Sequence, residues 1–261
     1  MVTNILTVDV EDNFTCEELE NKDDWQKYES QVVENTLRIL SLLQKHSATA
    51  TFFIVGKVAE RHPELVRYIV EDRHEIASHS YWHKPLTYMS FDAVEKDISM
   101  SAEILSSMTG GKIFGYRAMG YSVPENEVGF YSLLKKYGYM YDSSKKINNQ
   151  NICQTIQNGE IYQIYPSTVN IFSKKFLFSG GTYFRLFPMF LINIGFSSYR
   201  QSNQPVMLYV HPWEFNKDQP QRNVPFKQRV LQSPITFTTE KKLNYLLQRY
   251  KFVSIRDYLG L

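Results

Sequence analysis

The chain has 261 residues, of which 43% are hydrophobic and 21% charged, which excludes a disordered or collagen-like protein. The 29 basic and 27 acidic side chains give a net charge of +2, so the composition gives no reason to expect a nucleic-acid partner. We find no apolar stretch of about 18 residues and predict no transmembrane helix. The first residues lack the basic and apolar regions of a signal peptide, so we expect a cytoplasmic protein. Cys16 and Cys153 are expected to be free thiols.

In chain order, the first half predicts a strand at residues 5–10, a helix over 32–45, a strand at 48–55, a helix over 63–72 and a strand at 75–78. Pro63 is suited to begin the second of these helices, and Ser90 is suited to cap a third, which the glycines at 110 and 111 end. The helix over 32–45 has its apolar face at Val33, Leu37, Leu40 and Leu43.

The second half predicts a strand at 113–116, a helix that Pro124 opens and Gly138 closes, strands at 139–141 and 206–210, a last helix capped by Thr239, and a closing run at 252–255. Residues 145–205 are rich in Asn, Gln, Ser and aromatic residues and predict less regular structure. Strands that alternate with helices indicate right-handed βαβ units and a parallel sheet. We therefore expect an α/β fold in a single domain over residues 1–261.

Chemically active side chains lie at or just after the ends of the predicted strands. They are Asp9, Glu11, Asp12, His79, His83, Arg117, Asp142 and His211. In a parallel barrel these strand ends converge on one face, where such barrels place their chemistry. Polar residues scattered through a core would not share that position.

His79 and His83 are four residues apart and directly follow a predicted strand. On a helical turn, two such histidines point the same way and can hold one metal ion. Zinc takes histidine nitrogen and carboxylate oxygen, and a catalytic zinc site has three protein ligands. A pair of structural histidines is the alternative, which the acidic residues at another strand end disfavour.

Three acidic residues within four positions, Asp9, Glu11 and Asp12, follow the first predicted strand. They repel one another, and a divalent metal is the natural compensating charge. One carboxylate could bind the metal while another accepts a proton from water. Asp9 and Glu11 share a face if the strand continues, whereas Asp12 faces them only if the chain turns there. A solvated loop is the alternative, although the preceding residues look buried.

Three further residues each have a functional and a structural interpretation. Arg117 could fix a catalytic carboxylate or lie on the surface. His211, beside Trp213, suits either a general acid over an apolar acyl pocket or a structural histidine. A general acid here needs a nearby carboxylate, for which Asp142 and Glu214 are candidates; Asp142 is favoured because it comes from another strand end. Asp142 could instead cap the residues that follow it.

The chain lacks the Gly-x-Ser-x-Gly, P-loop and Gly-x-Gly-x-x-Gly motifs. It resembles the polysaccharide deacetylases, the NodB-homology domain of carbohydrate esterase family 4. Asp9-Val10-Glu11-Asp12 resembles a variant of that family's first motif, Thr-Phe-Asp-Asp-Gly, and His79-Ser80-Tyr81-Trp82-His83 matches the second, His-Ser/Thr-x-x-His. Tyr116-Arg117-Ala118-Met119 resembles the third, Arg-x-Pro, with Met119 in place of proline, and Leu208 to His211 resembles Leu-x-x-His.

A narrower resemblance is to the branch found in exopolysaccharide and surface-glycan gene clusters. That branch carries Asp-Val-Glu-Asp, Phe-Arg-Ala-Pro, Tyr-Asp-Ser-Ser, Gly-Gly-x-Tyr-Phe-Arg and His-Pro-Trp-Glu. Four of these strings occur in this chain in the same order, and Tyr116–Met119 stands in the place of Phe-Arg-Ala-Pro. The resemblance spans almost the whole chain, and several ordered motifs are more specific than any one.

The resemblance implies an irregular (β/α)7-type barrel and a role for several residues. Asp9 would be the general base, Arg117 would steady it, and His211 would be the general acid; Asp142 is counted with these catalytic residues. Two histidines and one carboxylate would hold the metal, usually zinc. Val10 stands where the family has an aspartate, so Glu11 and Asp12 both remain candidates.

The resemblance also implies a main-chain N–H near Gly120 that stabilises the oxyanion. The residues it places at the substrate are Gly120, Tyr121, Leu208, Trp213, Tyr183 and Arg185.

We therefore expect a metal-dependent hydrolase, with Zn²⁺ as cofactor, that removes the N-acetyl group from an amino sugar in a glycan or lipid-linked precursor. Its partner would be a carbohydrate, and surface-polysaccharide biosynthesis would be its setting. The alternatives are a metal-independent hydrolase of a small cyclic ureide, similar to allantoinase, and a catalytically silent glycan-binding protein. The sequence predicts neither the sugar nor the oligomeric state.

Overall fold

The computed structural model describes residues 2–16, 25, 28–146, 152–156, 159–171, 174–216 and 238–261. Its strands are β1 (Asn4–Val10), β2 (Thr51–Ile54), β3 (Glu75–Ser78), β4 (Gly115–Tyr116), β5 (Tyr141–Asp142), β6 (Cys153–Ile156), β7 (Ile161–Ile164), β8 (Thr168–Ile171), β9 (Lys174–Leu177), β10 (Met207–Val210) and β11 (Phe252–Val253). Its helices are α1 (Val32–Lys45), α2 (Gly56–Arg61), α3 (Pro63–Glu71), α4 (Phe91–Thr109), α5 (Glu127–Lys136), α6 (Gly181–Leu186), α7 (Met189–Gln201), α9 (Thr239–Leu247) and α10 (Ile255–Leu259). Four short 3-10 turns are η1 (Asn13–Cys16), η3 (Leu86–Tyr88), η4 (Met119–Tyr121) and η5 (Pro212–Phe215).

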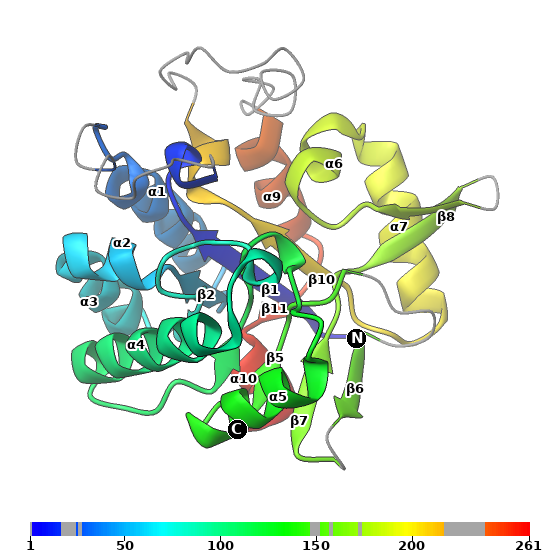
Figure 1. Cartoon of the computed structure of the whole chain (residues 1–261). Helices are drawn as coiled ribbons and strands as arrows, with labels where there is room; N and C mark the ends of the chain where they lie inside the picture. The colour runs from blue at the N-terminus through cyan, green and yellow to red at the C-terminus, as the bar shows by residue number, and fades with distance from the viewer. Residues whose placement is uncertain are drawn as a thin grey trace.

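Nine of the described strands form one sheet in the order β10-β1-β2-β3-β4-β5-β7-β6, with β11 also paired to β1. Neighbouring strands are parallel except β6 and β7, while β8 and β9 form a separate antiparallel pair. Helices surround the sheet, with α1 to α4 gathered on one side of β1 and β2 (Figure 1). The expected α/β barrel-type fold is confirmed, with the sheet strongly curled into a half-barrel.

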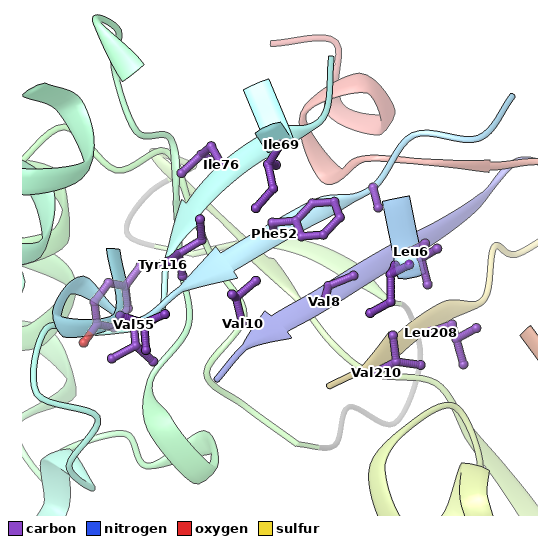
Figure 2. Packing of buried hydrophobic residues seen from close by; sticks show 14 of the residues in the cluster. Leu6, Val8, Val10, Phe52, Val55, Ile69, Ile76, Tyr116, Leu208 and Val210 are labelled. Atoms are coloured by element: carbon purple, nitrogen blue, oxygen red, sulfur yellow. The ribbon is translucent and has the colours of Figure 1, made fainter. Parts of the chain in front are cut away.

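The outer face of the sheet forms the larger part of the hydrophobic core. Leu6 of β1 pairs with Leu208 of β10, and Val8 pairs with Val210 on one side and Phe52 on the other. These fully buried side chains share one face and pack toward the helices (Figure 2). Because side chains alternate along a strand, the residues between them must face the inside of the curl.

The inner face carries a second cluster and the polar groups of the site. This cluster is formed by Ile5, Phe53, Ala77, Tyr141, Ile152, Ile164, Met207, Tyr209 and Ile255. Thr7 and Asp9 of β1 have the same alternation as Ile5 and are buried there among them. The polar residues at the strand ends therefore lie above an apolar floor.

Helix α1 has the predicted bounds, and its buried face agrees with the prediction in part. Leu40 and Leu43 of the predicted apolar face are buried, whereas Leu37 is 40% exposed. The buried face also includes Thr36, whose hydroxyl donates to the carbonyl of Val32 at 2.7 Å. Hydrophobic spacing alone missed this part of the face because it does not count a small polar residue whose hydrogen bond is made within the helix.

Several other boundaries differ from the prediction because local capping decides them. Helix α5 begins at Glu127 rather than at Pro124, since the side chain of Asn126 accepts from the amide of Gly129. Thr239 is the first residue of α9 and not its cap. A further helix, α10, follows, capped by Ser254, whose hydroxyl accepts from the amide of Asp257.

Residues 145–205 are more regular than predicted. Their described parts hold two antiparallel strand pairs and helices α6 and α7. Gly180 precedes α6 and lies against Tyr209, where a Cβ atom would come within 2.1 Å of the ring. This close approach explains why a glycine stands at position 180. A bridge between Gly180 and Tyr209 also joins this part of the chain to β10. The thiol of Cys153 is free and half-buried, whereas the side chain of Cys16 lies outside the described residues.

Leu208, predicted to contact substrate, belongs to the outer layer of the core, because its place in β10 turns it toward the helices. None of the helices in the described part of the chain is both long and apolar enough to span a membrane.

Leu208→Ala should lower the free energy of unfolding by about 2–5 kcal/mol, because it leaves a cavity in a packed layer. Leu37→Ala removes the same atoms from a partly exposed side chain and should have a much smaller effect. Denaturant unfolding of both variants measures the difference. Similar small losses in both would contradict the placement of Leu208 in the core.

Candidate active site

A cavity of about 520 Å³ opens at the C-terminal ends of the central strands. Its wall includes Asp9, Glu11, His79, His83, Arg117 and His211, so six of the eight predicted strand-end residues meet there. Asp12 and Asp142 are not among its described lining residues. The convergence of parallel strand ends accounts for the six that meet.

Glu11, His79 and His83 form a buried group that could hold a metal ion. One ligand atom from each lies within 4.8 Å of the other two. The Nε2 atoms of His83 and His79 lie 2.6 and 3.8 Å from Oε2 of Glu11. Two imidazoles and one carboxylate are the ligand types of a catalytic zinc site.

The second ring nitrogen of each histidine is fixed by a main-chain carbonyl. Nδ1 of His79 donates to the carbonyl of Arg117 at 2.7 Å, and Nδ1 of His83 donates to that of Thr15 at 2.9 Å. Each bond places a proton on Nδ1 and turns Nε2 toward Glu11, so Nε2 is the atom of each ring that could bind a metal. The donor set therefore fits a divalent metal.

The histidines lie on a loop and not on the helical turn that their spacing suggested. Ser80 and His83 both have positive φ, 61° and 52°. Asp97 of α4 holds this loop, since its two carboxylate oxygens accept from the amides of Tyr81 and Trp82 at 2.9 and 2.8 Å. The sequence analysis missed Asp97, although an acidic residue beside Val94 and Ile98 on an apolar helix face is a detectable signal.

Asp12 is turned away from the histidines. Its carboxylate accepts from the hydroxyl of Ser30 and the amide of Gln31, which precedes α1. Glu11 continues the inward face of β1 just past its last residue, whereas Asp12 points to the other side. Of the two carboxylates that the sequence left open, the structure brings Glu11 to the histidines.

Asp9 is paired with Arg117 inside the curled sheet. Nη1 of Arg117 lies 2.6 Å from Oδ1 of Asp9 and 3.0 Å from the hydroxyl of Thr7. Nη2 donates to the hydroxyl of Ser143 at 2.9 Å, and the guanidinium lies 4.0 Å over the ring of Phe53. Arg117 is fully buried, so the surface interpretation is wrong and the carboxylate-fixing interpretation is the one the contacts support. The sequence analysis did not single out Thr7 or Ser143.

His211 faces this group from β10. Its Nε2 lies 3.8 Å from both Oδ2 of Asp9 and Oε1 of Glu11. Its Nδ1 lies 3.1 Å from Oε1 of Glu214, and its ring stacks on Trp213 at 5.3 Å between centroids. The indole N–H of Trp213 also donates to Oε1 of Glu11 at 3.3 Å.

The carboxylate beside His211 is therefore Glu214, and the preference for Asp142 was wrong. Asp142 accepts from the amide and the hydroxyl of Ser144, which is the capping role considered as its alternative. Burial raises the pKa of Asp142 to about 6. A 3-10 turn, η5, bends the chain back so that Glu214 reaches the histidine three residues before it.

The pKa values of three titratable groups around the candidate metal site, Glu11, His79 and His211, differ for identifiable reasons. Burial opposes ionisation of Glu11, but His83, His211 and His79 outweigh it and hold the pKa of Glu11 well below its usual range. Burial lowers the pKa of His79 to about 4, against the pull of Asp9. Burial also works against the charged form of His211, but Glu214, Glu11 and Asp9 raise its pKa to about 9. The site thus favours a neutral ligand imidazole and a charged His211.

The other residues predicted at the substrate line the cavity, apart from Leu208. They are Gly120, Tyr121, Tyr183, Arg185 and Trp213. Arg185 lies 3.3 Å from Glu214 and 4.6 Å over the ring of Trp213. Lys242 supports this wall, because its ammonium donates to the carbonyls of Phe184, Arg185 and Phe187 at the end of α6. The sequence analysis missed Lys242, whose only signal is a charge next to the apolar face of α9.

Two family models match the chain. Residues 21–141 match the polysaccharide deacetylase model, and residues 131–260 match a domain of unknown function, DUF3473.

Curated relatives match over part of their length. A peptidoglycan-N-acetylglucosamine deacetylase of Bacillus cereus is 36% identical over 78 residues, which are 30% of this chain and 28% of that protein. An uncharacterized protein of Geobacillus stearothermophilus is 28% identical over 142 residues, 51% of this chain and 52% of that protein. The chain thus spans about half or less of the length of these relatives.

Solved structures share the fold. A candidate polysaccharide deacetylase from Mycobacterium smegmatis superposes with a TM-score of 0.67 at 20% identity, covering 99% of this chain and 88% of that one. A family 4 pseudoenzyme from Bacillus anthracis gives a TM-score of 0.57 at 15% identity, covering 99% and 66%. Residues 21–141, just under half of the chain, are thus similar to the polysaccharide deacetylases, and the chain as a whole shares the fold of these solved structures.

Proposed function

We propose that the protein is a metal-dependent hydrolase that removes the N-acetyl group from an acetylated amino sugar in a glycan or glycan precursor. The observation that carries this proposal is the placement of two unlike sets of groups in one cavity. Glu11, His79 and His83 form a set of metal ligands, while Asp9 and His211 lie beside them with separate partners. The names of relatives, a peptidoglycan-N-acetylglucosamine deacetylase and a chitooligosaccharide deacetylase, support the substrate class.

A divalent metal, for which we propose Zn²⁺, would supply Lewis acidity that polarises the acetyl carbonyl and acidifies water. Asp9 then serves as the general base that takes a proton from the attacking water. Arg117 orients Asp9 through the 2.6 Å contact, which also holds this carboxylate away from the ligand set. A main-chain N–H at Gly120 is the proposed donor to the oxyanion, because the next amide, that of Tyr121, already donates to Ala118.

His211 is the proposed general acid. Breaking the amide bond leaves an amine that needs a proton, and a charged imidazole at the cavity wall can supply it. Glu214 keeps His211 protonated and fixes its ring through Nδ1, so that Nε2 faces the reacting groups. Trp213 stacks on the other side and excludes water from one face of the imidazole.

Acetate release from N-acetylglucosamine oligomers and lipid- or nucleotide-linked amino sugars tests the proposal. Purified zinc-loaded protein should release acetate from at least one of them, and Asp9→Asn should reduce the rate by roughly 10²–10⁴-fold, the usual contribution of a general base. The variant should keep its zinc, because Asp9 is not in the ligand set. Loss of zinc from Asp9→Asn would contradict the separation of base and ligands, and normal turnover would remove Asp9 as the base.

Glu11→Gln and Asp12→Asn form a matched pair for the metal site. Each neutralises one carboxylate at neighbouring positions, but only Glu11 faces the histidines. We expect Glu11→Gln to lose most bound zinc, and Asp12→Asn to keep it. Zinc content after dialysis, with unfolding followed in parallel, measures this. Zinc loss in Asp12→Asn from a folded protein would reverse the assignment.

Glu214→Gln tests the protonation of His211. A general acid works in its protonated form, so the rate should fall as the pH rises through the pKa of His211. Glu214 is the largest influence that raises this pKa, and its neutralisation should move the alkaline limb to lower pH. Glu103→Gln on the exposed face of α4 is the control and should leave the limb in place. An alkaline limb unmoved by Glu214→Gln would show that another group sets it.

A further inference from the structure

Lys242 of α9 is a charged group behind the cavity wall that the proposed chemistry does not use. It is buried, with 8% of the residue exposed. Its ammonium donates to the carbonyls of Phe184, Arg185 and Phe187 at 2.9, 2.7 and 2.8 Å. An ammonium has three protons, so each carbonyl can take one of them. Burial of an ammonium is costly unless its donors are satisfied, and here the end of α6 satisfies them.

The carbonyls that Lys242 holds lie at the C-terminal end of α6. Two of them belong to the helix and the third to Phe187, the residue that follows it. The last carbonyls of a helix have no partner within it, and a cation is favourable at this end. A helix of six residues is only marginally stable alone. Lys242 therefore ties the end of α6 to α9.

Helix α6 carries Arg185 to the carboxylate that contacts His211. Nε of Arg185 lies 3.3 Å from Oε1 of Glu214, and Nδ1 of His211 lies 3.1 Å from the same oxygen. The guanidinium of Arg185 also lies 4.6 Å from the ring centre of Trp213, which stacks on His211. A displacement of the end of α6 would therefore move Arg185 relative to both neighbours of His211.

Lys242 also approaches this group through α9. Helix α9 packs against η5, the turn that contains the fully buried Glu214. Burial lowers the pKa of Lys242 to about 8, although the charge of Glu214 acts in the opposite direction. The two charges are thus close enough to interact. Lys242 is not among the described residues that line the cavity, so any role in the reaction must act through other residues.

We propose that Lys242 is a positioning residue for the proposed general acid. Its ammonium fixes the end of α6, so that Arg185 holds Glu214 and Trp213 where they keep the ring of His211 oriented. The proposal rests on the proposed deacetylase function and adds a residue to that same site. Because the link is one of geometry, loss of the ammonium should reduce turnover much more than substrate binding.

Lys242→Met keeps an unbranched side chain and removes the charge with its donors. For zinc-loaded protein acting on N-acetylated chitotetraose, kcat should fall by roughly 10- to 100-fold, as for a displaced catalytic group, with KM nearly unchanged. Lys242→Arg keeps a charged donor and should retain most of the rate. Lys241→Met makes the same change in net charge at the exposed neighbouring position of α9 and should leave both constants unchanged.

A double-mutant cycle separates positioning from a general effect on the fold. If Lys242 acts through Glu214, Lys242→Met should cause little further loss of kcat in a Glu214→Gln protein, because the charged contact is already removed. An equal loss in both backgrounds would overturn the proposal. So would an unchanged kcat in Lys242→Met.

The hydrogen bond between His211 and Glu214 can also be followed without turnover. The Nδ1 proton of His211 should give a downfield proton NMR resonance, assigned by its loss in His211→Gln. We expect this resonance in the wild-type protein and in Lys241→Met, and its broadening or loss in Lys242→Met. Lys242→Gln, whose amide has two donors and no charge, replaces Lys242→Met if that variant does not fold.

The resonance distinguishes failure of this proposal from failure of the proposed function. If chitotetraose releases no acetate but the resonance is lost in Lys242→Met alone, the proposed function fails for this sugar and the positioning role stands. A resonance that Lys242→Met leaves unchanged would reject the role, whatever the activity.

Discussion

The buried ion pair between Arg117 and Asp9 is the interaction on which the site depends. Its guanidinium lies fully inside the curled sheet, where desolvation opposes a charge. The charge persists because Asp9, Thr7 and Ser143 accept from its two terminal nitrogens while Phe53 lies beneath it. Removal of one partner from such a pair typically costs about 3–5 kcal/mol, since the other charge stays buried. The main-chain carbonyl of Arg117 also orients His79, so one residue positions both the proposed base and a proposed metal ligand.

Strand alternation is what makes this arrangement possible. Even-numbered residues of β1 face the helices and build the outer core, and odd-numbered residues face the inside of the curl. Thr7 and Asp9 follow this alternation, and Glu11 extends it by one more step beyond the strand. Asp12 falls on the other side, where its carboxylate accepts from the amide of Gln31, the residue before α1. A shift of one residue in register would exchange the roles of the whole set.

Much of this could be predicted from the sequence, for particular reasons. The strand-end positions of Asp9, His79, Arg117 and His211 could be predicted because short apolar runs mark where strands end. The sequence favoured Asp142 over Glu214 as the partner of His211. The contact with Glu214 depends on the 3-10 turn η5, and a turn this short is hard to predict from composition. Asp97 and Lys242 were missed because both act on main-chain groups, whose positions depend on the completed fold. Leu208 was misplaced because a motif match does not say which way a side chain faces.

We propose that Glu11, His79 and His83 hold the metal while Asp9 stays outside the ligand set, paired with Arg117. A crystal structure of the zinc-loaded protein, with anomalous scattering at the zinc edge, tests it most directly. We expect one zinc bound by Nε2 of both histidines and a carboxylate oxygen of Glu11, with the contact between Asp9 and Arg117 retained. Zinc bound by Asp9 or Asp12, or the absence of zinc from this position in folded, zinc-saturated protein, would contradict it.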